Sequence, residues 1–305
     1  MRRLAAAFGL AACAAVCAQT PPPPRGLDGV RAFEHLRQMV AIGPRPSGSA
    51  ALRQTRAYIT HQLSAAGLTV QEQGFIATTP AGKVDMTNLV VRLPGRRSDR
   101  ILFTGHYDTK LLPGFVGASD GASSAAILIE LARTLKDRPR EFTYEFVWFD
   151  GEEALCKGWD ECGQPDSPDN TYGSRFYVKA AQEAQALASI KAMILFDMIG
   201  AKDLRIRRET DYSTPWLNDI VWAAAGRLDQ RATFVDADGP VGGDDHLPFA
   251  KAGVPSIDLI DLADYPQWHD TVCCDDLAHV APASLQIVGD VILAALPEIE
   301  KRLIR

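Results

Sequence analysis

Two histidines and three carboxylates of this 305-residue chain lie at or just after the ends of short apolar segments, or at the start of a helical one. They are His106, Asp120, Glu153, Asp197 and His269. Carboxylates gathered at one place repel one another and would be partly protonated unless a cation neutralised them. Imidazole nitrogens together with carboxylate oxygens suit zinc. Each residue alone is typical of a cap or a solvated loop, but the five together predict a zinc site.

Glu152 and Glu153 form an adjacent acidic pair directly after the apolar run Phe146-Val147-Trp148-Phe149 and Asp150-Gly151. Neighbouring side chains diverge in extended or loop structure, so one carboxylate can bind a metal while the other faces a substrate. The second carboxylate would then act as a general base or acid, with its pKa set by its charged surroundings. The alternative is that both glutamates lie on the surface. The apolar segment directly before them disfavours this alternative.

The segments that must position these residues alternate between strand-like and helix-like patterns. We expect strands over 88–93, 101–104, 143–149, 192–196 and 255–260, and helices over 31–40, 49–66, 123–135, 172–187, 214–228 and 283–296. This alternation predicts an α/β fold with three layers, α/β/α, around a central, mostly parallel, mixed and twisted sheet. Ligand sites in such sheets lie beyond the carboxyl ends of the strands, where the chemical residues of this chain stand.

The chain divides into three predicted parts. Residues 1–18 combine a basic start with an Ala-rich apolar run too short to span a bilayer, which favours a signal peptide and an exported protein, periplasmic or extracellular. Cys13 stands in a segment like a bacterial lipoprotein box, so a lipid anchor is the alternative. Residues 19–27 form a Pro-rich linker and 28–305 one catalytic domain without a membrane span. The net charge of −6 argues against a nucleic-acid partner.

Four cysteines follow the predicted signal peptide: Cys156, Cys162, Cys273 and Cys274. An even number in an exported protein favours structural disulfides, in any of three connectivities. A zinc ion bound by all four thiolates is disfavoured, because the adjacent Cys273 and Cys274 cannot easily reach one tetrahedral ion.

Several of these segments resemble, in order and spacing, the zinc aminopeptidase and glutaminyl cyclase superfamily over nearly the whole mature chain. The segments are Gly43-Pro44-Arg45-Pro46-Ser47-Gly48, Gly105-His106-Tyr107-Asp108, Ser119-Asp120-Gly121-Ala122, Phe149-Asp150-Gly151-Glu152-Glu153, Tyr172-Gly173-Ser174-Arg175, Asp245-His246-Leu247-Pro248-Phe249 and the late His269. The resemblance implies the three-layer zinc-exopeptidase fold. It also implies peptide substrates with a free N-terminus, and we expect a monomer.

The superfamily contains two chemistries that use nearly the same residues. In its two-zinc aminopeptidases, counterparts of all five predicted ligands bind metal, with His106 and Asp197 serving the second ion. In its animal-type glutaminyl cyclases, counterparts of Asp120, Glu153 and His269 hold one zinc. The resemblance makes Glu152 the catalytic base in both branches, and the five ligands do not distinguish them.

Residues around the predicted ligands resemble the cyclase branch more closely. Trp268 immediately precedes His269, Trp159 follows Glu153 closely, and Asp244 stands where the aminopeptidases more often have serine. In a cyclase the two tryptophans would shape the substrate pocket, and Asp197 and Asp244 would support the catalytic proton transfer. The alternatives are that the tryptophans only pack and that Asp244 caps the following helix. The segment 157–170, with Cys156 and Cys162 beside and within it, departs from the animal cyclases.

We therefore predict a zinc-dependent glutaminyl-peptide cyclotransferase that converts N-terminal glutamine to pyroglutamate and ammonia. A two-zinc aminopeptidase that hydrolyses N-terminal residues is the alternative. A non-catalytic peptide-binding member of the family is a minor alternative, which the intact Glu152 and the complete ligand set oppose.

Overall fold

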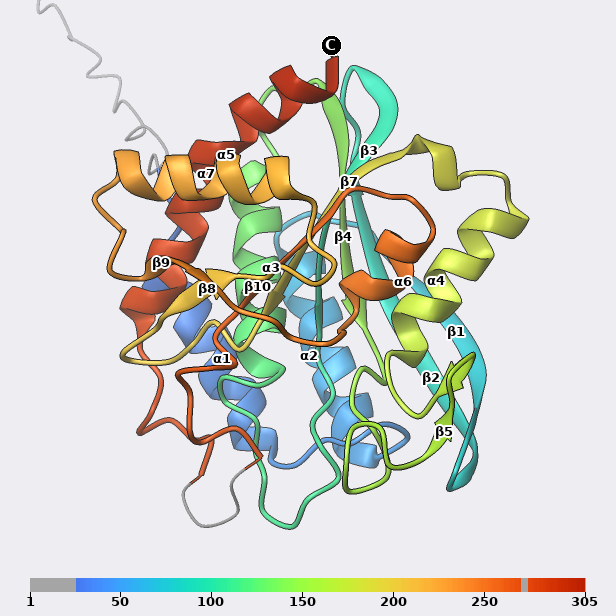
Figure 1. Cartoon of the computed structure of the whole chain (residues 1–305). Helices are drawn as coiled ribbons and strands as arrows, with labels where there is room; N and C mark the ends of the chain where they lie inside the picture. The colour runs from blue at the N-terminus through green and yellow to red at the C-terminus, as the bar shows by residue number, and fades with distance from the viewer. Residues whose placement is uncertain (1–25, 270–273, 305) are drawn as a thin grey trace, which may run out of the picture.

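The computed structural model describes residues 26–269 and 274–304, and Figure 1 shows their arrangement. One six-stranded sheet runs through the centre in the order β1-β2-β4-β3-β7-β10. Its strands are β1 (Val70–Thr79), β2 (Gly82–Leu93), β3 (Arg97–His106), β4 (Phe142–Phe149), β7 (Ile190–Asp197) and β10 (Ser256–Ile260). The pairs β5 (Gly163–Gln164) with β6 (Ser167–Pro168) and β8 (Ile206–Arg208) with β9 (Phe234–Asp238) lie outside this sheet.

The sheet is mixed but parallel at its centre. β4, β3, β7 and β10 pair in parallel, and β1 and β2 add an antiparallel edge. The carboxyl ends of the four parallel strands therefore meet at one edge, and the registers His106↔Phe149 and Ile260↔Asp197 show that they end almost level. The predicted mostly parallel sheet is confirmed.

Helices cover both faces of the sheet, as Figure 1 shows. The helices are α1 (Gly29–Ile42), α2 (Ala50–Ala65), α3 (Ala122–Leu135), α4 (Tyr172–Glu183), α5 (Pro215–Arg227), α6 (His246–Lys251) and α7 (Pro282–Ile304), with a short 3-10 turn at Leu187–Ser189. Side chains alternate across a strand. In β3, Ile101 and Phe103 thus face the large core under α1, α3 and α7, whereas Leu102 faces the smaller core under α4 and α6. The predicted three-layer fold is confirmed.

All the strands and helices predicted from the sequence are present, with shifted ends. The helix expected over 172–187 ends at Glu183, because the chain reverses through Gln185 with a left-handed φ of 53°. The sequence did not predict β1, whose edge position leaves it largely polar, the short helix α6, or the pairs β5–β6 and β8–β9.

The C-terminal helix α7 is long and apolar enough to cross a membrane by length and composition alone. Half of its most apolar window is buried inside the protein, and it packs against α1, α3 and α5. These contacts identify it as a helix of the large core. The predicted signal peptide, Cys13 and most of the predicted linker lie outside the described residues.

Arg45 ties the N-terminal segment to the loops at the carboxyl ends of the strands. Its buried guanidinium donates to the carbonyl oxygens of Tyr107 (3.0 Å), Val116 (2.6 Å) and Gly117 (2.9 Å). These carbonyls belong to the segment between β3 and α3, which carries Asp108 and Asp120. The Gly-Pro-Arg-Pro motif noted in the sequence therefore fixes the loops on which the candidate site is built.

Arg45→Ala removes three donors and leaves buried carbonyl oxygens without partners. Since each such group costs about 1–3 kcal/mol, we expect the free energy of unfolding in urea to fall by about 3 kcal/mol or more. Arg53→Ala is the matched control, because the exposed Arg53 side chain donates to the Gly48 carbonyl (2.9 Å) at the surface, and its loss should cost less than about 1 kcal/mol. Equal losses in the two variants would contradict this account of Arg45.

Candidate active site

The five predicted metal-ligand residues converge at the carboxyl edge of the parallel strands. His106 ends β3, Asp197 ends β7, Glu152 and Glu153 follow β4, and Asp120 precedes α3. Four of the five ligands are buried, and His269, from the loop after β10, is mostly buried with a side chain 19% exposed. His269 adopts a left-handed φ of 49°, an uncommon conformation that is frequent at functional sites.

Asp120, Glu153 and His269 form one compact group. The His269 Nε2 atom lies 3.2 Å from Asp120 Oδ2 and 3.2 Å from Glu153 Oε1. Ligand atoms bound to one tetrahedral zinc at about 2.0 Å lie about 3.3 Å apart, so these separations suit a shared ion. Glu153 Oε2 is buried without a hydrogen-bond partner among the described residues. The donor set and spacing fit zinc.

His106 forms a second group around the same aspartate. Its Nε2 atom lies 3.1 Å from Asp197 Oδ1 and 3.2 Å from Asp120 Oδ1. Asp120 thus stands between the two groups, with one carboxylate oxygen toward each histidine. Burial acts to lower the pKa of His106, but the charges of Glu152 and Asp197 outweigh it and hold the pKa well above its ordinary value. An imidazolium at this position neutralises part of the surrounding negative charge.

Glu152 points away from its neighbour Glu153, as the sequence predicted for the adjacent pair. Its Oε2 atom lies 3.8 Å from His106 Nδ1, while Glu153 contacts His269. Burial, together with the negative charges of Asp244 and Glu153, raises the pKa of Glu152 well above its ordinary value. A carboxyl group with a raised pKa is suited to accept and return a proton.

Asp244 also lies in the site. It does not cap the following helix: the residue at the N-cap of α6 is Asp245, and the Asp244 side chain accepts instead from the Asp245 N–H. Burial and the neighbouring charge of Asp197 raise the pKa of Asp244 to about 7. Beneath it, the buried His246 lies between Glu209 (3.4 Å) and Asp258 (3.6 Å), which anchors the start of α6.

Three further aspartates position the site and were not recognised as site residues from the sequence. Asp275 accepts from the backbone N–H groups of Ser119 (2.7 Å) and Asp120 (2.8 Å). Asp108 accepts from the N–H groups of Glu152 and Glu153, each at 3.3 Å. Asp150 accepts from the Thr87 N–H (2.8 Å) and the Ser47 hydroxyl (2.7 Å). Asp108 and Asp150 stand after predicted strands, but Asp275 has no such signal.

Two tryptophans wall a small cavity of about 160 Å³ above the ligand groups. Glu152, Asp197 and Asp244 line it together with Trp159, Trp268 and all three residues of the His269 group. The Trp268 ring stacks on the His269 imidazole with centroids 4.3 Å apart, and Trp268 remains 38% exposed. The structure therefore brings the predicted site residues to one cavity, except His106, which contacts Asp120 and Asp197 without lining it.

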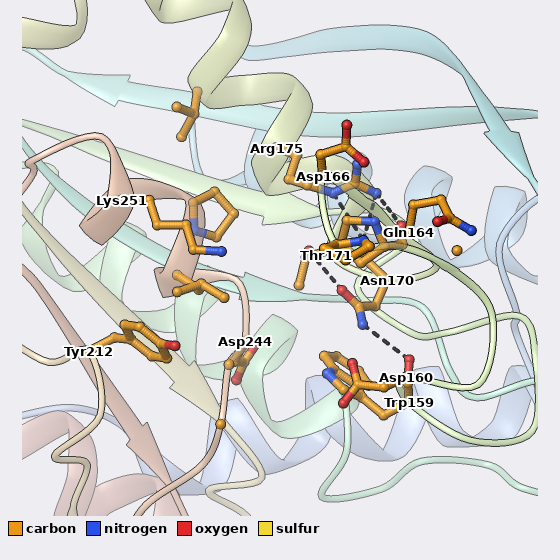
Figure 2. Close-up of a pocket in the computed structure, with 18 of the residues that line it drawn as sticks. Trp159, Asp160, Gln164, Asp166, Asn170, Thr171, Arg175, Tyr212, Asp244 and Lys251 are labelled. Atoms are coloured by element: carbon orange, nitrogen blue, oxygen red, sulfur yellow. Dashed lines mark hydrogen bonds between the residues drawn. The ribbon is translucent and has the colours of Figure 1, made fainter.

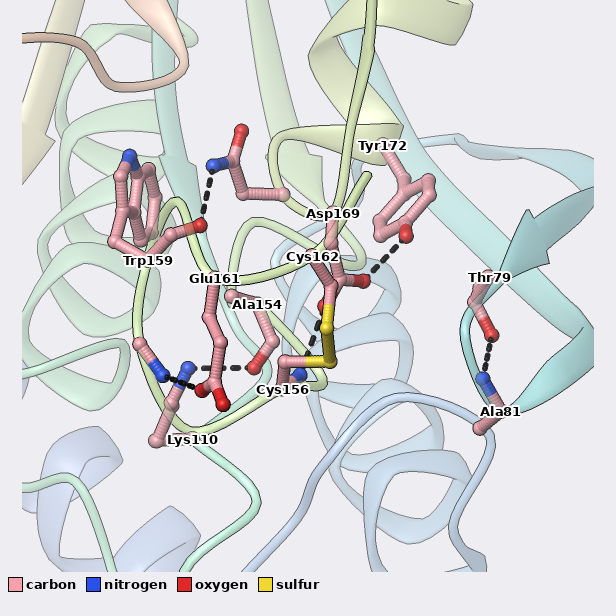
Figure 3. Close-up of a disulfide and its surroundings, with 12 residues drawn as sticks. Thr79, Ala81, Lys110, Ala154, Cys156, Trp159, Glu161, Cys162, Asp169 and Tyr172 are labelled. Atoms are coloured by element: carbon pink, nitrogen blue, oxygen red, sulfur yellow. Dashed lines mark hydrogen bonds between the residues drawn. A yellow bond between two sulfur atoms is a disulfide. The ribbon is translucent and has the colours of Figure 1, made fainter. Parts of the chain in front are cut away.

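The loop that carries Trp159 is closed by a Cys156–Cys162 disulfide (Figure 3). Asn170 donates to the Trp159 carbonyl (3.3 Å), and Asp169 accepts from the Cys156 N–H (2.8 Å). The predicted disulfide is confirmed for this pair. Cys274 is exposed and has no disulfide partner among the described residues, and Cys273 lies outside them, so the prediction for that pair stays a prediction.

The fold and the site define an α/β enzyme of the zinc-exopeptidase type. The model of Peptidase family M28 matches residues 88–296, and the chain belongs to that family. This confirms the superfamily predicted from the motifs.

Named relatives fall in both branches. A glutaminyl cyclase structure from an Acidobacteriales bacterium is 35% identical, with a TM-score of 0.82 over 95% of this chain and 100% of that one. A glutaminyl-peptide cyclotransferase-like protein of Bos taurus is 28% identical over 292 residues, 86% of this chain and 73% of the relative. A leucine aminopeptidase precursor from Bacteroides thetaiotaomicron VPI-5482, 23% identical with a TM-score of 0.81 over 90% and 98% of the two chains, shares the fold.

Zinc binding to the Asp120–Glu153–His269 group should release a proton. Burial acts to lower the pKa of His269, but its bonds to Asp120 and Glu153 raise it to about 10. The imidazole is therefore protonated at neutral pH in the metal-free protein, and zinc needs it deprotonated. We expect the apparent zinc affinity, measured by competition with a chelator, to rise about tenfold per pH unit from pH 6 to 8.

His61→Ala, on an exposed face of α2, is the matched control and should keep the wild-type affinity and slope. His269→Ala should lose most of the affinity. An affinity that does not change with pH, or a His269→Ala protein that binds zinc as tightly as wild type, would contradict the assignment.

Proposed function

We propose that this protein is a zinc-dependent glutaminyl-peptide cyclotransferase. The observation that carries the proposal is the small cavity walled by Trp159 and Trp268, with Glu152 and Asp244 facing the ligand group. A cavity of about 160 Å³ suits one compact N-terminal residue folded on itself. The glutaminyl cyclase from the Acidobacteriales bacterium, alike over its whole length, supports the same chemistry.

We assign one zinc ion to Asp120, Glu153 and His269. A single ion needs a second cation beside Asp120 and Asp197. His106 can supply it, because its Nε2 atom lies 3.1 Å from Asp197 and 3.2 Å from Asp120 and the charges of Glu152 and Asp197 raise its pKa well above the ordinary value. An imidazolium in that position supplies the second positive charge that a two-zinc site would supply with metal. When bound, zinc acts as a Lewis acid toward the γ-carboxamide oxygen of the substrate glutamine.

The protein side chains then carry the proton chemistry. The substrate α-amine attacks the γ-carboxamide carbon, and Glu152 accepts the proton that the amine loses as the new C–N bond forms. Glu152 returns this proton to the departing nitrogen, which leaves as ammonia when the original amide C–N bond breaks. Asp197 and Asp244 orient the groups that exchange the proton.

The two tryptophans that wall the cavity favour cyclisation over hydrolysis. Trp159 and Trp268 exclude water from the cavity, and their faces hold the amine close to the amide carbon. Because the two reacting groups are held close together, much of the entropy cost of ring closure is removed from the barrier.

We further propose that the mature protein is an exported monomer consisting of one catalytic domain over 28–305, after a signal peptide over 1–18 and a linker over 19–27. The Cys156–Cys162 disulfide supports an oxidising compartment. Lipidation at Cys13 is the alternative route to the same compartment. Its partners are peptides with a free N-terminus.

A two-zinc aminopeptidase is the second candidate. The observation in its favour is that His106, Asp120 and Asp197 also place ligand atoms within 4.8 Å of one another. On that assignment, Asp120 would be shared by two ions and Glu152 would activate water for hydrolysis of the first peptide bond.

The test is turnover of a glutaminyl dipeptide and a leucyl dipeptide by the purified mature protein with one equivalent of zinc. We expect ammonia and a pyroglutamyl product, read by mass, from the glutaminyl substrate only. Glu152→Gln should lower kcat by about 10²–10⁴-fold and keep zinc, because it removes the proton carrier and not a ligand. Release of free leucine without pyroglutamate would replace the proposal by the aminopeptidase.

Glu153→Gln is the matched contrast to Glu152→Gln, since it alters the adjacent residue and should lose zinc together with activity. Glu183→Gln, on an exposed site of α4 with a side chain 68% exposed, should retain both. If Glu152→Gln and Glu153→Gln lost zinc equally, the separate roles assigned to the two glutamates would be wrong.

A further inference from the structure

A second and larger cavity adjoins the one that holds the ligand groups. It measures about 700 Å³, within the range of about 300–1,000 Å³ typical of ligand sites, whereas the reactive cavity measures about 160 Å³. Trp159, Gly243 and Asp244 line both cavities. The two spaces therefore share one wall, formed by the disulfide-closed loop on one side and the segment before α6 on the other.

The shared wall gives the direction in which a bound peptide must run. If the N-terminal residue fills the reactive cavity, as the proposed function requires, the rest of the peptide cannot fit there and must continue past Trp159 and Asp244. The larger cavity is the space that opens on the far side of these residues. Figure 2 shows Trp159 and Asp244 toward the lower part of this cavity, with the remaining labelled residues extending above and beside them.

Hydrogen bonds within the chain hold one wall of the larger cavity in place. Arg175 donates to the Pro168 carbonyl (2.8 Å) and the Asn170 carbonyl (2.8 Å), and its guanidinium lies 4.8 Å from the centroid of the Tyr172 ring. Arg175 is thus committed to structure and orders the chain between the disulfide loop and α4. Lys179, further along α4, has a carboxylate neighbour in Glu183 at 3.9 Å.

Lys251 is different from these two cations. It is exposed at the last position of α6 and forms no ion pair or hydrogen bond with any residue in the described part of the chain. Across the cavity stand the exposed carboxylates of Asp160 and Asp166, as Figure 2 shows. Lys251 is therefore an available cation on one side of the cavity, and Asp160 and Asp166 are exposed carboxylates on the other.

The length of α6 sets which residue of a peptide meets Lys251. The helix begins directly after Asp244 and Asp245 and has six residues, so it is about 9 Å long. An extended peptide advances about 3.3 Å per residue. Lys251, at the far end of α6, therefore stands about two to three residue lengths of an extended peptide beyond Asp244.

We propose that the larger cavity is the subsite for the peptide segment that follows the N-terminal glutamine, and that Lys251 selects an acidic side chain at the third or fourth residue. The inference rests on the proposed function, since that function places the glutamine in the smaller cavity. An acidic side chain would pair with Lys251, and the facing Asp160 and Asp166 would repel it from the other wall. Lys251 is thus a specificity residue remote from the chemistry.

The experiment compares kcat/KM for cyclisation of tetrapeptide amides that carry one glutamate or one lysine at position three or four, the other positions being glycine. A partly exposed ion pair is weak, so we expect glutamate to be preferred by about 1.5- to fivefold. The preference should lie in KM, because the pair forms equally in the ground and transition states. It should shrink at high salt, which screens exposed charges.

Lys251→Glu should invert the preference, so that the lysine peptides become the better substrates. Lys301→Glu is the matched control, because Lys301 is also an exposed lysine in the last turn of a helix but lies outside both cavities. It should keep the wild-type ratio of acidic to basic peptides.

The outcomes separate this inference from the proposed function. Cyclisation of all peptides with no preference at either position, a preference for lysine in the wild type, or the same ratio in Lys251→Glu would overturn the subsite and leave the cyclase in place. Failure to cyclise any of these tetrapeptides would overturn both the subsite and the proposed cyclase.

Discussion

The concentration of buried negative charge at one sheet edge is the constraint on which the rest of the site depends. Asp120, Glu152, Glu153, Asp197 and Asp244 are all buried and line one cavity. So many carboxylates can stay ionised out of water only if cations stand among them. The protein supplies His106 and His269, and the His269 group is arranged as a ligand set for zinc. The two histidines and the metal are therefore structural requirements of the site as well as chemical ones.

Holding these charges in place requires a rigid surround. Asp275 fixes the backbone before α3, Asp108 fixes the two glutamates, and Arg45 fixes the loop between β3 and α3. Gly121 follows Asp120 with φ of 86°, and a side chain there would meet the Asp108 carbonyl at 2.4 Å. Hydrogen bonds from backbone N–H groups thus do much of the positioning, which leaves the ligand atoms free to face a metal.

Much of this arrangement follows from the sequence because strand ends and chemistry coincide. Buried parallel strands are apolar along their length, so His106 and Asp197 mark where those strands stop. The partition between Glu152 and Glu153 also follows from local geometry. Asp275 and the larger cavity do not follow, because they depend on how distant loops meet. The edge strand β1 and the six-residue α6 carry too weak a periodic signal to be predicted.

The central claim is that one zinc ion compensates this buried charge at the Asp120–Glu153–His269 group while the imidazolium of His106 takes the second cationic position. The most direct measurement is anomalous X-ray scattering at the zinc edge from crystals of the mature protein prepared with excess zinc. The account predicts a single strong peak, about 2 Å from ligand atoms of Asp120, Glu153 and His269. A second peak between His106 and Asp197, or no peak at the His269 group, would contradict it.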